Sequence, residues 1–146
     1  MSDISGAGGT GARGKLGTAE LIIVIAGAVA LVSTFLDWFS IGDFGDNAWS
    51  DSMLFPTFAW VGIFGAIMAI QIALVTFGNV NLPRDVLGFT WTQIHLVLAV
   101  FCVILTLSFL IGGEEQAIGF WLGLLASIAL LVGAVMLRNE TAGRTI

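Results

Sequence analysis

The sequence contains no tyrosine, one cysteine, one histidine and two prolines among its 146 residues. Because Cys102 has no second thiol to pair with, the chain can form no intramolecular disulfide. The lone His95 cannot supply the several histidines that zinc enzymes commonly use, and no hydrolase or phosphate-loop motif is present. We therefore expect a non-catalytic protein that needs no metal or other cofactor.

Charged residues are also scarce. They make up 10 % of the chain, whereas hydrophobic residues reach 58 % and the mean hydropathy is +1.02. A soluble domain is about 45–50 % apolar even when glycine is counted. A water-soluble core cannot use so much apolar surface, so lipid must be the solvent for most of the chain. We expect the lipid bilayer as a partner and no nucleic acid.

Four long apolar runs follow a glycine-rich polar tail at residues 1–17. Each run is close to the ~20 residues that a bilayer-spanning helix needs. None alternates polar with apolar residues, which disfavours a membrane barrel. The predicted fold is an all-α membrane protein, with four transmembrane helices in an antiparallel bundle within residues 18–138 and a second tail at 139–146. The expected helices are about 19–39, 54–77, 90–111 and 117–137.

Basic residues are missing from the first and third loops of this arrangement. All five lie on the other side of the membrane: Arg13, Lys15, Arg84, Arg138 and Arg144. The positive-inside rule therefore predicts a multi-pass plasma-membrane protein with both termini cytoplasmic. The first and third loops carry only acidic charges, which we call the outer acidic rim: Asp37, Asp43, Asp46, Asp51, Glu114 and Glu115.

The stretch FLDWFSIGDFGDNAWSD, residues 35–51, belongs to this outer side. Asp37 is expected at the end of the first helix, where the helix dipole disfavours an anion by about 0.3–1 kcal/mol. It is either a hydrated residue at headgroup depth or part of a rim that attracts cations. Aromatic residues are concentrated at the same depth, which indicates packing and an interfacial belt rather than a ligand cage. The tryptophans assigned to this belt are Trp38, Trp49, Trp60 and Trp121.

Three of the four runs carry small residues at four-residue spacing. Such stripes let helix backbones approach closely in lipid, where the hydrophobic effect gives helices little reason to associate. We therefore predict a tight bundle. The stripes are Ala26, Ala30 and Thr34 in the first run, Gly65, Ala69 and Ala73 in the second, and Gly119, Gly123 and Ser127 in the fourth.

The third run has a polar stripe instead, formed by Thr92, His95, Ala99, Cys102 and Thr106. Its spacing of three and four residues defines one helical face. Gln71 lies at a similar depth in the second run, and a buried polar group needs a partner. We infer that Gln71 and His95 face each other or share a water as a buried polar layer. The alternatives for His95 are a bond to Thr92 or a backbone carbonyl, a porphyrin-iron ligand, or a proton-relay site.

Several short motifs along the chain resemble those of a known group of proteins. These are FLDWFS at the end of the first run, Trp49 in the first loop, Leu82–Pro83 before the third run and GFWLGLLASIALLVGAVM in the last. Together they resemble small four-span membrane proteins of unknown function that are common in actinobacteria. In that group the first helix more often ends in L-P-W-F or L-P-W-Y, whereas here Asp37 stands where proline would fall. The resemblance implies a topology and no particular chemistry.

Two functions of different class are consistent with these features. The leading interpretation is a non-catalytic scaffold or accessory subunit of a membrane complex. It would contact copies of itself or other membrane proteins through the outer acidic rim and the small-residue stripes. The alternative is an oligomeric channel or transporter for a small solute or cation. Its entrance would be the outer acidic rim, and its constriction would be the layer of Gln71 and His95.

Overall fold

The computed structural model describes residues 15–50, 57–111 and 115–144. The predicted tail as far as residue 14 lies outside these ranges, as do Asp51 and Glu114 of the outer acidic rim. Within them, the chain forms four helices and two short hairpins, so the mostly helical fold is confirmed. The elements are α1 (Thr18–Ser33), β1 (Asp37–Ile41), β2 (Phe44–Asn47), α2 (Ala59–Thr76), β3 (Asp85–Val86), β4 (Phe89–Thr90), α3 (Trp91–Ile111) and α4 (Ile118–Arg144).

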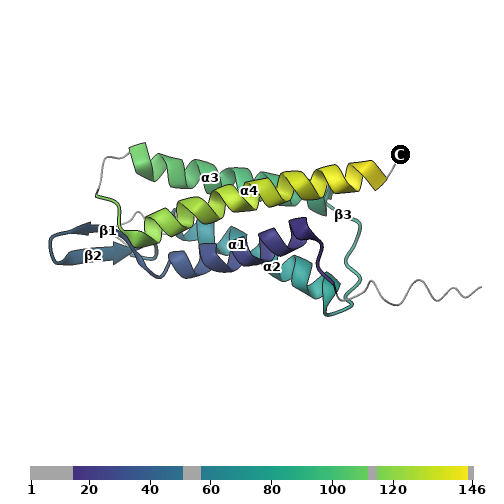
Figure 1. Cartoon of the computed structure of the whole chain (residues 1–146), viewed down its shortest axis with the longest axis horizontal. Coiled ribbons are helices and arrows are strands. Elements are labelled where there is room, and N and C mark those ends of the chain that lie inside the picture. The colour runs from purple at the N-terminus through teal and green to yellow at the C-terminus, as the bar shows by residue number, and fades with distance from the viewer. Residues whose placement is uncertain (1–14, 51–56, 112–114, 145–146) are drawn as a thin grey trace, which may run out of the picture.

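The four helices run antiparallel along one long axis (Figure 1). Helix α1 packs against α2 and α4, and α3 packs against the same two helices on the other side. The β1–β2 hairpin lies at one end of the bundle. The start of α1, the β3–β4 hairpin and the end of α4 lie at the opposite end (Figure 1).

Three of the described helices, α2, α3 and α4, are long and apolar enough to cross a bilayer. Helix α1 is apolar but has only 16 residues. At 1.5 Å per residue its length is about 24 Å, less than the ~30 Å hydrocarbon core. The predicted first span of 19–39 is therefore too long, because the chain leaves the helix after Ser33 and enters β1 at Asp37.

Side chains explain where α1 ends. The hydroxyls of Ser33 and Thr34 donate to the carbonyls of Ala30 and Leu31 at 2.7 and 2.6 Å. The Ser33 carbonyl accepts the Trp38 indole N–H at 2.8 Å, and the Thr34 carbonyl accepts the Ala48 backbone N–H at 3.1 Å. The last carbonyls of a helix need partners of this kind. Because the following loop supplies them, the helix can stop inside a continuous apolar run.

Two other boundaries also differ from the prediction. Helix α2 begins at Ala59 rather than at 54, and α4 continues to Arg144, so the predicted tail at 139–146 is helical as far as that residue. Hydropathy marks where a helix leaves lipid, whereas the backbone ladder continues until its hydrogen bonds are interrupted. The Thr141 hydroxyl donates to the Leu137 carbonyl at 2.8 Å within this extension.

The small-residue stripes are used for packing inside the chain. A methyl group on Gly27 would overlap the Gly65 carbonyl oxygen, so the backbones of α1 and α2 touch there. On α4, a methyl group on Gly123 would lie 2.9 Å from Trp38 Cζ2. The Gly119, Gly123 and Ser127 stripe is buried in the bundle. The expectation that the stripes contact partners is therefore wrong for Gly65, Gly119 and Gly123, because other elements of the chain pack against them. Gly27 lies outside the predicted stripes.

Candidate functional site

An aromatic cluster fills the bundle at the β1–β2 end. Trp38 is fully buried at its centre. Its ring centroid lies 5.7 Å from that of Phe58, 5.8 Å from Phe109 and 6.0 Å from Phe120. Aromatic pairs at such separations attract beyond their buried area. Trp38 was expected in an interfacial belt, and that expectation is wrong. Trp60 and Trp121 expose their rings as belt residues do.

A small sheet lies at the same end of the bundle, and its strand β1 contains Trp38 of this cluster. Strand β1 pairs with β2 on one edge, with Phe39 opposite Asp46 and Ile41 opposite Phe44. On its other edge the Ser40 N–H donates to the Glu115 carbonyl at 3.2 Å, and the Ala117 N–H donates to the Trp38 carbonyl at 2.8 Å. Residues before α4 thus act as a third strand, which ties the first and third loops together.

The described members of the outer acidic rim lie on this sheet and beside it. Asp37 is exposed as the first residue of β1, so it does not end α1 and the helix-dipole argument does not apply. Its carboxylate lies over Gly45, where a methyl group would come within 2.8 Å of Asp37 Oδ2. Asp43, Asp46 and Glu115 are on the hairpin or its third strand. Among the described residues, no three potential metal ligands lie together.

The buried polar layer differs from the prediction. His95 is only 2 % exposed, and neither ring nitrogen has a hydrogen-bond partner among the described residues. The expected direct bond from His95 to Gln71 is therefore wrong. The alternatives of a bond to Thr92 or to a backbone carbonyl are wrong among the described residues for the same reason, and the Thr92 hydroxyl pairs with that of Thr90 at 3.0 Å. The shared-water, porphyrin-ligand and proton-relay hypotheses stay predictions.

The face of α3 that carries His95 is buried as its spacing predicts. Ala99, Cys102 and Thr106 are fully buried on the same face. The Thr106 hydroxyl donates to the Cys102 carbonyl at 3.0 Å, and the Cys102 thiol approaches the Val61 carbonyl of α2 at 3.7 Å. A Ser or Thr hydroxyl that donates a hydrogen bond to a carbonyl of its own helix needs no partner on another helix. His95 cannot do this, which makes it the exceptional polar group of this face.

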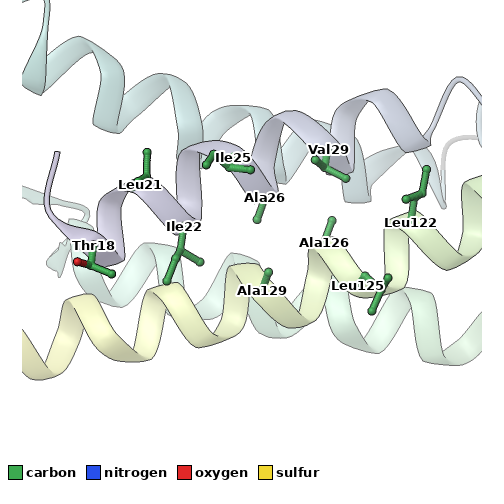
Figure 2. Close-up of a pocket in the computed structure, with 10 residues that line it drawn as sticks. All are labelled: Thr18, Leu21, Ile22, Ile25, Ala26, Val29, Leu122, Leu125, Ala126 and Ala129. Atoms are coloured by element: carbon green, nitrogen blue, oxygen red, sulfur yellow. The ribbon is translucent and has the colours of Figure 1, made fainter.

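An apolar groove of about 430 Å³ lies between α1 and α4 (Figure 2). Its floor includes Ala26, Ala126 and Ala129, and larger side chains such as Ile25 and Leu125 form its rims. The alanines of the two helices point toward each other across the gap (Figure 2). The residue pattern does not predict this groove, although Ala26 belongs to one of the predicted stripes. Helix spacing, rather than residue type, decides whether such alanines close on one another.

Comparison with protein-family models, curated proteins and solved structures finds no match to this chain. The resemblance to small four-span actinobacterial membrane proteins therefore stays a prediction.

Proposed function

We propose that this chain is a non-catalytic accessory subunit or scaffold of a plasma-membrane complex. In this proposal a transmembrane helix of another membrane protein lies in the groove between α1 and α4. The outer acidic rim would face basic residues of the same partner outside the membrane. Both termini would be cytoplasmic, because the described basic residues Lys15, Arg84, Arg138 and Arg144 lie at the α1-start end of the bundle.

The observation that carries this proposal is the alanine floor of the groove. Helices associate in lipid where small residues let their backbones come close. The buried glycines of α1, α2 and α4, such as Gly27, Gly65 and Gly123, are already in contact with other parts of the chain. The groove brings small residues of two helices together beneath larger rim side chains, with Ala26 and Ala126 buried and Ala129 half-buried. It is therefore a surface that suits a partner helix.

The alternative was an oligomeric pathway for a small solute or cation. A single copy offers little support for it, because Trp38, Phe58, Phe109 and Phe120 fill the interior at the end where the acidic rim lies. A pathway would then have to run between copies. The accessory-subunit proposal requires no such opening.

Site-specific photocrosslinking in intact cells tests the proposal. A photoreactive amino acid at Leu125, on the rim of the groove, should crosslink one membrane protein that mass spectrometry identifies. Ile104 on α3 is the matched control, because its exposed fraction of 55 % is close to the 64 % of Leu125 and it lies outside the groove. Ala129→Leu should fill the floor and abolish the Leu125 product.

Three results would count against the proposal. The Leu125 probe could capture no protein, it could capture the same proteins as the Ile104 probe, or its product could survive Ala129→Leu. A product consisting only of two copies of this chain would place a self-contact at the groove and would also exclude the proposed partner.

A further inference from the structure

Helix α2 presents a largely exposed face. Ile67, Ile70 and Leu74 are 44 %, 57 % and 43 % exposed. Together with Gln71 they follow the three- and four-residue spacing of one helical stripe. The four residues line a groove of about 240 Å³, whose remaining walls are Leu82, in the loop after α2, and Trp91, the first residue of α3. We call these residues of α2 the α2 face. It shares no residue with the groove between α1 and α4.

A single polar side chain lies in the middle of this α2 face. Gln71 is about 8 Å from the end of α2 at 1.5 Å per residue, inside a segment whose length and composition suit a membrane span. Among the described residues, its side-chain amide has no hydrogen-bond partner, and His95 is not one. An amide in an apolar environment is costly unless it is paired. The neighbours that line its groove are mainly apolar side chains.

We propose that the α2 face binds the α2 face of a second copy of this chain, with the two Gln71 amides paired at its centre. Two copies inserted in the same direction are related by a twofold axis along the membrane normal. Rotation about that axis leaves the depth of every residue unchanged. Gln71 therefore meets a Gln71 at its own depth.

The chemistry of the side chain supports the same occupant. A glutamine amide has both an N–H donor and a carbonyl acceptor, so two of them can bond reciprocally. Such bonds across helices help transmembrane helices associate. A different protein would need its own polar group at the same depth, whereas a second copy supplies one by symmetry. The proposal adds self-association to the proposed function and does not depend on the partner in the α1–α4 groove.

Measuring the monomer–dimer equilibrium in liposomes tests this proposal, with single-molecule subunit counting across a series of protein-to-lipid ratios. The intact chain should dimerise. Gln71→Leu should weaken the dimer about 3- to 30-fold, the range expected for losing an interhelical hydrogen bond in lipid. Ser108→Leu is the matched control, because Ser108 is an exposed polar residue of α3 whose hydroxyl donates to its own helix at 2.8 Å. It should leave dimerisation unchanged.

Disulfide crosslinking maps the face independently. In a Cys102→Ala background, cysteine at Ile67, Ile70 or Leu74 should form a crosslinked dimer on oxidation in native membranes, whereas cysteine at Ile25 or Ile104 should not. A monomer at all ratios would overturn the proposal, because lipid or water would then satisfy Gln71. A dimer whose affinity is unchanged by Gln71→Leu would also overturn the proposal. So would a dimer that crosslinks through cysteine at Ile25 and not through the α2 face.

Discussion

Substituting Gly27 by alanine adds one methyl group where the backbones of α1 and α2 touch. That group would overlap the Gly65 carbonyl oxygen and lie 2.9 Å from Ala69 Cβ. Neither neighbour is the end of a flexible side chain, so the helices themselves must move apart. Overpacking of a tight interior costs typically about 1–3 kcal/mol. Alanine also favours the helix by up to about 1 kcal/mol over glycine, which offsets part of this loss.

A matched glycine separates the two effects. Gly143 lies near the end of α4, and a methyl group there meets nothing within 4 Å. Gly143→Ala should therefore gain helix propensity without a steric cost. We expect Gly27→Ala to be less stable than Gly143→Ala by about 1–3 kcal/mol, the overpacking cost.

Reversible unfolding in mixed detergent micelles, followed by circular dichroism, would measure this difference. Equal stability of the two variants would refute the reasoning. It would mean that α1 and α2 do not cross in backbone contact at Gly27 and Gly65.

Three further predictions address topology and the interior. In a Cys102→Ser background, cysteine at Asn47 or Gln116 should react with an impermeant thiol reagent on intact cells, and cysteine at Asn81 or Thr141 should not. Labelling of Asn81 and Thr141 alone would show that the proposed topology is inverted. Trp38→Ala should lower the free energy of unfolding by about 3–5 kcal/mol, because it empties the centre of the aromatic cluster, and a thermal melt unchanged from that of the intact chain would contradict this. His95→Leu should keep or raise stability by removing two unpaired nitrogens, and its effect should add to that of Gln71→Leu within about 0.5 kcal/mol. A destabilised His95→Leu variant would show that His95 has a partner, such as a buried water.

Features that depend on local composition could be predicted from the sequence. The apolar runs locate the helices because any backbone in lipid must pair its own polar groups. The third run illustrates this, since the predicted 90–111 and the observed Trp91–Ile111 differ by one residue. The same helix buries the face predicted from its polar spacing, with His95 and Cys102 on it.

Features that depend on contacts between distant segments could not be predicted from the sequence. The apolar run of α1 continues past Ser33, yet the helix ends there because Trp38 and Ala48 supply hydrogen bonds from farther along the chain. Hydropathy likewise cannot distinguish a tryptophan in the headgroups from one inside the bundle, since both follow an apolar run.

The sequence by itself therefore determined that this is an apolar, mostly helical chain whose described basic residues lie at one end of the bundle, because these properties follow from composition and from the order of the apolar runs along the chain. Only the tertiary structure decided which small residues touch one another, that Gln71 and His95 do not pair, and that the α1–α4 groove stays open. These outcomes depend on helix rotation and crossing distance. Both are set by packing across the whole bundle, where a shift of one methyl group decides contact.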